Sequence, residues 1–388
     1  MVTLASADSA LKSFYLDAVA QQLNTEVNPL LAKIKQSTAD VWGKEVRRLA
    51  QYGVNGGVGA GTEEGSLPAA GGNNYDQFVT TLKNLYGTIE ISDKAVRASE
   101  NSAGAFVDLL NAEMEGLLRS SAFNFGRMLF GDGSGILCTV SAVTGNVVTV
   151  DSVKNVIEGM TVDVLDADGD QVSGVTARRI TAVDRTDKTI TLSGGALTGV
   201  ASGCTLCVQG SHNLELTGLG AIFKDDGSLY GLSRAERPWM VPYIKESVGT
   251  ISENAIQTAI DYLEETAGSR VDMIVCSWGV KRALQAVLSE SRMQTDMAEL
   301  AGGYRTITYN GIPVVADRFC PAGTMYLLNT RDFCLHQLCD WKWLEGDDGK
   351  VLRQVPGKPL YTATLVKYAD LICTRPCGQA MLTGITEK

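Results

Sequence analysis

Four residues have the types and spacing of a metal site. Cys204 and Cys207 flank two residues, His212 follows five positions later, and Cys138 lies at the other end of the same β-rich stretch. Zinc in structural sites takes four such sulfur and nitrogen ligands, so a Cys₃His site is one interpretation. The alternation of side chains along a strand, however, would put Cys204 and Cys207 on opposite faces. We therefore favour packing, and expect neither a metal nor a cofactor.

Other patterns that could carry chemistry are incomplete. Asp166, Asp168 and Asp170 resemble the start of a calcium loop, but the twelfth position, which needs a bidentate glutamate, is Ala177, so a solvated turn is favoured. The glycine-rich stretch 53–72 neither ends in Lys-Ser/Thr nor opens a helix, which argues against a phosphate cradle. No Gly-x-Ser-x-Gly turn occurs, and neither histidine lies in a recognisable nucleophile arrangement. We expect that the protein is not an enzyme.

The cysteines indicate a reducing compartment. Nine of them, an odd number, are spread over 388 residues that begin without a secretory pattern. We interpret Cys334, Cys339, Cys373 and Cys377 as small buried apolar side chains. A disulfide that forms after the protein leaves the reducing cell is the alternative.

The charge and the hydrophobicity of the sequence exclude two further classes of protein, those that grip nucleic acid across a broad face and those that span a membrane by a helix. Lys and Arg number 34 against 44 Asp and Glu, a net charge of −10, whereas a protein that grips nucleic acid across a broad face needs clustered basic side chains. No run approaches the roughly 20 apolar residues that a membrane helix needs. With 45% hydrophobic residues the chain can form two or three units, each with its own core.

Patterns at the start of the chain predict an arm and a long hairpin. Helical spacing of apolar residues runs over 9–23, a short helix follows at 30–34, and 46–52 suits a strand. Residues 53–74 hold eight glycines and cannot pack a core, so they predict a loop tip. Alternation over 78–91 predicts a strand that returns from that tip.

A long helix and a β-rich stretch follow. Apolar residues at helical spacing from Ser102 to Phe130 predict one helix of about 43 Å at ~1.5 Å per residue. Short alternating runs between turns predict a small all-β barrel or sandwich within 132–215, inserted so that its two ends return to one place. This stretch has ten acidic and five basic residues, hence half of the net charge. Its predicted strands are 138–143, 147–150, 160–165, 179–183, 189–192 and 204–208.

The last part of the chain mixes helices and strands. Ser252 and Gly268 suit the two ends of a helix, and Ser277 suits the start of another. Asn310-Gly311 between apolar runs is typical of a tight hairpin. The fold class is therefore α+β. Further strands are predicted at 271–276, 325–328, 360–368 and 380–385.

Four short motifs occur in order with the predicted arm, hairpin and helix: Val27–Ile34, Gly87–Ser92, Gly311–Asp317 and Met325–Asn329. Together they resemble the major capsid proteins of tailed bacteriophages, the Hong Kong 97-type fold that bacterial encapsulins share. The likeness covers nearly the whole chain outside the β insertion. It implies an N-terminal arm, an extended β-hairpin loop, a long spine helix, and peripheral and axial domains, with an inserted small all-β domain.

This resemblance divides the chain into five parts. They are the N-terminal arm (1–50), the extended loop over a neighbouring subunit (51–90), the peripheral domain with the spine helix (91–131), the inserted all-β domain (132–215), and the axial domain with the remaining peripheral-domain strands (216–388). Subunit contacts are expected at the loop tip. The residues concerned are Gly56, Gly57, Gly59, Glu63, Glu64 and Leu67.

Two features depart from some members of that family. Some join their subunits by Lys-Asn bonds from a lysine on the extended loop, but 48–82 contains no lysine and Lys83 comes only on the return strand. Covalent joining is therefore not expected. Some also carry a long charged scaffolding segment before the arm, whereas this arm begins almost at Met1, so a separate scaffolding protein is expected.

The function implied by the resemblance is that of a major capsid protein. It would self-assemble as pentamers and hexamers into an icosahedral head shell, enclose double-stranded DNA without sequence-specific binding, and contact a portal and a decoration protein but no membrane. It would be assembled in the bacterial host cytoplasm and reside in the virion. Three alternatives stay open: an encapsulin-like bacterial shell protein, a phage surface protein that binds host glycans through the β insertion, and an enzyme that uses Cys204, Cys207 and His212.

Overall fold

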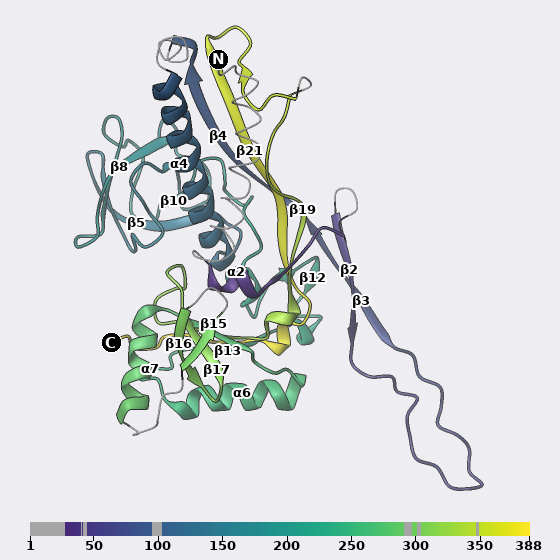
Figure 1. Cartoon of the computed structure of the whole chain (residues 1–388). Coiled ribbons are helices and arrows are strands. Elements are labelled where there is room, and N and C mark those ends of the chain that lie inside the picture. Colours follow the sequence, from purple (N-terminus) through teal and green to yellow (C-terminus); the bar gives the residue numbers. More distant parts are fainter. Residues whose placement is uncertain are drawn as a thin grey trace.

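The computed structural model describes residues 28–39, 41, 45–94, 103–290, 297–300, 304–346 and 349–388. The helix expected over 9–23 lies outside these residues. Figure 1 shows a body built around one long helix and two sheets, with a β-barrel on one side and a narrow hairpin that projects away from the body. No helix within the described ranges is long and apolar enough to cross a membrane.

The first sheet joins segments that lie far apart in the sequence. Its path is β1 (Lys35–Ser37), β19 (Phe333–Trp343), β21 (Leu360–Cys373) and β20 (Arg353–Gln354), and β4 (Lys83–Ser92) pairs antiparallel with β21. Only β1 pairs parallel, with β19. The sheet can therefore form only when early and late parts of the chain meet.

The spine helix of the body, α4 (Ala103–Phe130), packs against β4, as its apolar stripe predicts. Phe125 and Leu129 on its inner face are 1% and 0% exposed. The close crossing depends on Gly87, because a Cβ at that position would lie 2.9 Å from Cδ1 of Leu117. A larger residue at 87 would force the Leu117 side chain to move.

A second sheet of seven strands has its own core and two helices, α6 (Glu253–Ala267) and α7 (Trp278–Glu290). Both predicted ends of α6 are present: the Ser252 side chain accepts the Ala255 N–H, and Gly268 adopts a φ of 57°. In sheet order the strands are β13 (Tyr243–Lys245), β22 (Ala380–Leu382), β18 (Met325–Leu328), β14 (Met273–Cys276), β17 (Ile312–Ala316), β16 (Tyr304–Tyr309) and β15 (Met297–Leu300).

Residues between α4 and the second sheet form a closed six-stranded barrel, one of the two forms predicted. Its interior is filled by valine, leucine, isoleucine and cysteine side chains, so it is a packed core rather than a channel. Each strand lies at a predicted position. Around the barrel they are β10 (Thr205–Val208), β5 (Ile136–Thr144), β6 (Val147–Val150), β9 (Thr189–Leu192), β8 (Arg178–Asp184) and β7 (Thr161–Leu165).

The two ends of the barrel meet beside α4. Segments 131–135 and 209–218, called the neck below, are joined by a 2.9 Å backbone hydrogen bond. Next to it, Arg127 of α4 and Glu215 form an ion pair in which each side chain is only 3% exposed. The barrel is thus inserted into the body through one narrow, tightly packed junction.

Short elements connect these units. The hairpin consists of β2 (Glu45–Tyr52) and β3 (Asn74–Thr81). The others are α2 (Pro29–Lys33), α5 (Leu219–Ile222), β11 (Ser228–Leu229), β12 (Leu232–Ser233), η2 (Pro238–Met240), η3 (Thr330–Asp332) and η4 (Pro376–Gly378).

The structure differs from the sequence prediction in several places, and the short strands β1, β13, β15 and β20 were also not predicted. The predicted strand 78–91 is divided into β3 and β4, which belong to different sheets. Strand β21 runs on to Cys373, and β22 ends already at Leu382. Strand β19 is missing from the prediction, because register shifts between Gln337 and Cys339 and again after Cys339 disturb the alternation that marks a strand.

Asp317 lies where the barrel touches the second sheet. Its side chain is 2% exposed, one carboxylate oxygen accepts the Phe319 N–H over 2.8 Å, and the other has no hydrogen-bond partner. Lys154 of the barrel donates to the carbonyl oxygen of Cys320 beside it. Burial raises the pKa of Asp317 to about 6, although the positive charges of Lys154 and Arg318 act to lower it.

We expect the fold to lose stability as this carboxyl ionises. The pKa of about 6 in the folded protein lies above the reference value of 3.8. The contribution of the protonated Asp317 to the free energy of unfolding is therefore fully present below pH 3.8 and is lost as the pH rises through 6. Between about pH 4.5 and 7.5 the loss should reach about 2 kcal/mol relative to Asp317→Asn, which does not titrate. Urea unfolding of both proteins across this range measures it, and parallel pH curves would contradict it.

Candidate assembly interface

The projecting hairpin has a paired stem and an unpaired tip. Strands β2 and β3 pair antiparallel along their full lengths. Residues 53–73, called the extended loop below, continue beyond that pairing and lie far from α4 and the barrel in Figure 1. The chain therefore has an extended hairpin with a glycine-rich end, as its sequence predicts.

Two glycines let the two sides of the extended loop approach each other. A Cβ at Gly57 would lie 2.8 Å from the backbone nitrogen of Gly71, and a Cβ at Gly71 would meet Gly57 still more closely. The Asn55 side chain accepts the Gly57 N–H over 2.9 Å and donates to the Asn73 side chain over 3.2 Å. Because these glycines have no side chain, the two sides of the loop can lie close together, and larger residues would force them apart.

The exposed side chains of the extended loop include large apolar ones. Leu67 is 89% exposed, and Val54 and Val58, which the sequence analysis did not single out, are 84% and 88% exposed. Burying one such side chain contributes about 1.5–3 kcal/mol, so contact with another surface would stabilise the loop. Of the six predicted contact residues, only Gly57 is half-buried. The exposed ones are Gly56, Gly59, Glu63, Glu64 and Leu67.

Aromatic packing anchors the stem in the body. Phe78 of β3 is fully buried, with its ring centroid 5.5 Å from that of Tyr230 and 5.9 Å from that of Trp239. Tyr52 of β2 stacks on Trp239 at 5.1 Å. Both strands of the stem are therefore held by the same segment of the body.

A buried carboxylate ties the stem to β21. Asp370 accepts hydrogen bonds from the Thr80 hydroxyl of β3 and, over 2.9 Å and 3.1 Å, from the N–H and hydroxyl of Thr217. Burial raises its pKa, while the hydrogen bond from Thr80 acts to lower it. Arg237 forms an ion pair with Asp76 on the same strand. The stem is thus held to the body at several points, and the tip projects beyond it (Figure 1).

The residues considered for zinc are not brought together. Cys138 and Cys204 line the barrel core, Cys207 is buried beside Glu215, and the His212 ring contacts the neighbouring asparagine amide over 2.9 Å. Burial raises the pKa of Cys207 to about 11, which keeps this thiol protonated. Within the described residues, no three His, Cys, Asp or Glu side chains are placed to share a metal ion.

The aspartates considered for calcium form a turn. The Asp166 carboxylate accepts the N–H groups of Asp168 over 3.0 Å and Asp170 over 2.9 Å. Its oxygen is therefore used by the backbone of its own turn, which agrees with the solvated turn that we favoured.

All nine cysteines lie within the described residues, and none of them forms a disulfide. Cys334 and Cys373 are buried, as interpreted from the sequence. Cys339 and Cys377 are only half-buried, so that interpretation is wrong for these two. Cys339 follows one of the register shifts of β19, which changes the direction in which its side chain points relative to regular alternation.

The chain combines a spine helix that crosses a sheet, a second sheet with its own core, and a long hairpin. This combination is a capsid-type fold, the fold of the tailed-bacteriophage capsid proteins. The solved structure that carries this assignment is a chain of the cyanophage A-1(L) capsid. It matches with a TM-score of 0.57 and 14% sequence identity, and the match covers 97% of this chain and 94% of that one.

Two further structures match less closely. A capsid chain of a native GTA particle has a TM-score of 0.46 and 12% identity, covering 93% of this chain and 91% of that one. A chain of Mycobacterium phage Bobi has a TM-score of 0.46 and 7% identity, covering 94% and 92%. At these scores they add no weight to the assignment. No family model and no curated protein matches the chain.

Proposed function

We propose that this protein is the major capsid protein of a tailed bacteriophage, a structural subunit without catalytic activity. Pentamers and hexamers of it would form an icosahedral head shell. The observation that carries the proposal is the extended loop, which exposes large apolar side chains on a fold shared with a phage capsid over nearly its whole length. Such a loop gains stability only when it is buried against a neighbour.

The contents and partners of the shell follow from the same proposal. The shell would enclose double-stranded DNA without reading its sequence. A net charge of −10 suits this role, because a negatively charged shell does not bind DNA tightly. A scaffolding protein, a portal and a decoration protein are the proposed partners. Assembly would take place in the bacterial host cytoplasm and lead to the virion. The five domains and their boundaries remain predictions from the sequence.

Assembly tests this function directly. The full chain, expressed alone and together with a candidate scaffolding protein, is expected to form capsomers or megadalton particles. Negative-stain microscopy and light scattering would detect them. A protein that stays monomeric at high concentration under both conditions would exclude the proposed function.

Leu67→Asp is expected to raise the protein concentration needed for assembly at least about tenfold. The reason is that each ~1.4 kcal/mol lost from a contact changes its equilibrium constant by that factor, and burying a leucine is worth about that much or more. The matched control is Leu338→Asp, which alters a leucine that is 55% exposed on β19. Light scattering as a function of protein concentration compares the two variants. If both substitutions impair assembly equally, the extended loop is not a specific contact between subunits.

A further inference from the structure

Asn-Gly, the dipeptide at which asparagine is most easily converted to aspartate, occurs twice in the chain. In this reaction the backbone nitrogen of the glycine attacks the side-chain carbon Cγ of the asparagine, and ammonia leaves. Glycine favours the attack because it has no Cβ to hinder the approach. Asn55-Gly56 lies in the extended loop and Asn310-Gly311 in the hairpin between β16 and β17, and all four residues are exposed. The two sites therefore differ in backbone geometry rather than in access to water.

The hairpin holds Asn310 in a geometry that opposes this attack. Its φ of 48° and the φ of 78° at Gly311 belong to a two-residue turn, which the pairing of Tyr309 with Ile312 closes. The side-chain nitrogen of Asn310 donates to the Gln257 side chain of α6 over 3.0 Å. Ring closure would require the backbone to leave this turn and the amide to leave α6. We therefore expect conversion of Asn310 to be slow.

The extended loop holds Asn55 in the opposite way. The Gly57 N–H donates to Oδ1 of Asn55 over 2.9 Å, and the ring that this hydrogen bond closes contains the Gly56 nitrogen, so the side chain folds back toward the atom that must attack. As Cγ becomes tetrahedral, negative charge develops on Oδ1, and the same N–H stabilises it. A Cβ at Gly56 would meet nothing within 4 Å, so the space around this glycine is open. Asn55 is thus placed for the attack, and it lies beyond the last pair of β2 and β3, which would otherwise hold its backbone.

We propose that Asn55 is a site of spontaneous deamidation, and that the modification makes an unassembled subunit less able to join a shell. The Gly56 nitrogen bonds to Cγ of Asn55 and gives up its proton, the Cγ–Nδ2 bond breaks, and the side-chain nitrogen leaves with that proton as ammonia. The resulting succinimide takes up one water molecule, which opens it to aspartate or isoaspartate. The reaction needs no oxidant, enzyme or cofactor. Its effect on assembly rests on the proposed function, whereas the reaction itself does not.

The product alters the extended loop at its narrow part. The side-chain nitrogen of Asn55 donates to Oδ1 of Asn73 on the other side of the loop over 3.2 Å, and a carboxylate has no N–H with which to make this bond. Isoaspartate also lengthens the main chain by one carbon where the two sides lie close together. The new carboxylate adds a third negative charge to a loop whose only charged residues are Glu63 and Glu64. A loop changed in pairing, length and charge fits a neighbouring subunit less well.

Peptide mapping of the full chain by mass spectrometry tests the reaction. After incubation in mildly alkaline buffer, Asn55 is expected to be converted at least about tenfold faster than Asn310, the ratio that ~1.4 kcal/mol of restraint in the turn would produce. Asn55→Gln is the control, because the longer side chain would have to close a six-membered ring, and the mass gain should disappear from this peptide. Equal rates at the two sites, or no conversion of Asn55, would overturn the modification.

Assembly shows whether the modification affects the shell. Particles formed from partly aged protein are expected to contain a smaller share of converted Asn55 than the chains left unassembled. Asn55→Asp should need a higher protein concentration for assembly than Asn310→Asp, which adds the same charge at the other Asn-Gly site. Converted and unconverted chains that enter particles in equal shares would overturn the effect on assembly. A freshly purified chain that forms no particles would instead overturn the proposed function, and peptide mapping of Asn55 would still decide the reaction.

Discussion

Glu215→Gln is expected to lower the free energy of unfolding by about 3–5 kcal/mol. Glutamine keeps the size of the side chain but removes its charge, which leaves the Arg127 guanidinium buried without a counter-ion. Both side chains are only 3% exposed, so little water reaches the guanidinium, and Nε of Arg127 has no hydrogen-bond partner. Urea unfolding followed by tryptophan fluorescence measures the loss.

The matched control is Glu158→Gln. Glu158 pairs with Arg185 over 3.6 Å, but these side chains are 43% and 63% exposed, so this substitution should cost at most about 1 kcal/mol. The double variant Arg127→Met with Glu215→Leu should recover most of the stability, since an apolar pair of similar size replaces the ions without leaving a buried charge. If Glu215→Gln costs no more than Glu158→Gln, the ion pair does not hold the neck.

Phe78→Ala should cost about 3–5 kcal/mol, the usual penalty for removing a buried aromatic ring. Phe78 is fully buried, and its ring packs against Tyr230 and Trp239, which belong to the body. The cavity left by the ring would loosen the stem. Thermal and urea unfolding measure the stability, and light scattering measures assembly.

Leu49→Ala on the paired strand of the same stem is the control. Leu49 is 66% exposed, and its truncation is expected to change stability by less than about 0.5 kcal/mol. The Phe78 variant should also assemble less readily, because a loosened stem must be ordered again at each contact. A Phe78 variant as stable as the Leu49 variant would show that the stem is anchored chiefly by its polar contacts.

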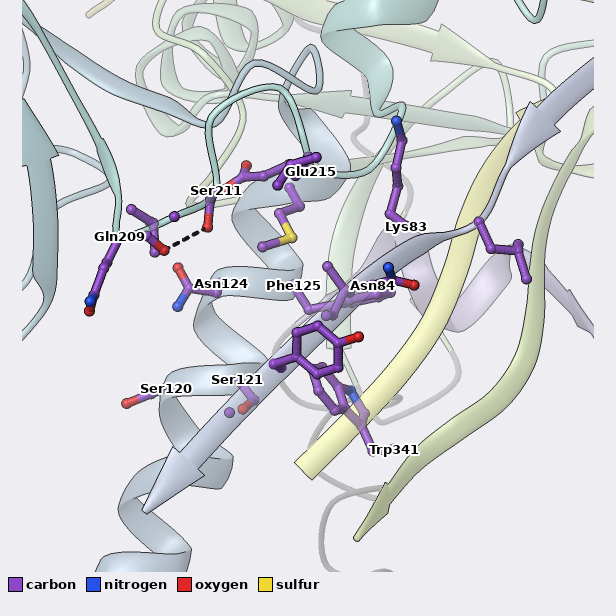
Figure 2. A pocket seen from close by; sticks show the side chains of 18 of the residues that line it. Lys83, Asn84, Ser120, Ser121, Asn124, Phe125, Gln209, Ser211, Glu215 and Trp341 are labelled. Carbon is purple, nitrogen blue, oxygen red and sulfur yellow. Dashed lines mark hydrogen bonds between the residues drawn. The ribbon is translucent and has the colours of Figure 1, made fainter. Parts of the chain in front are cut away.

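These contacts fix the stem of the hairpin to the body and leave the extended loop at its end exposed. The stem is fixed by buried rings and by Asp370, whereas the extended loop carries exposed apolar side chains on a backbone narrowed by glycines. Between α4, the start of β4, Trp341 and the neck, the body contains a cavity of about 500 Å³ (Figure 2). The projecting segment is thus the part of the described chain best placed to contact another molecule.

Local patterns were sufficient for elements whose signals lie within a few residues. The six barrel strands follow alternation between turns, and α4 follows a helical stripe of apolar residues. Ser252 and Gly268 mark α6 because the first and last turns of a helix need outside partners for their backbone groups. Asn310 and Gly311 form the tight turn with φ of 48° and 78° because these residues tolerate positive φ.

The candidate interface was predictable only in part. Many glycines and no core-forming run pointed to a projecting loop, and Leu67 could be named as a contact residue. Val54 and Val58 were missed, although an apolar side chain in a glycine-rich loop is itself a visible signal of contact. The cavity of the body could not be predicted, because its walls come from β4, α4, β19 and the neck, which lie far apart in the sequence.

The sequence by itself determined the α+β class, the barrel, the long helix and the glycine-tipped hairpin, since each depends on patterns within one segment. Tertiary structure alone decided the partner of β4, the insertion of β19, the buried pair of Arg127 with Glu215, and the meeting of Thr80 and Thr217 at Asp370. The physical reason is that these contacts join residues far apart in the chain. Their stability comes from burial and charge pairing that exist only once those segments are brought together.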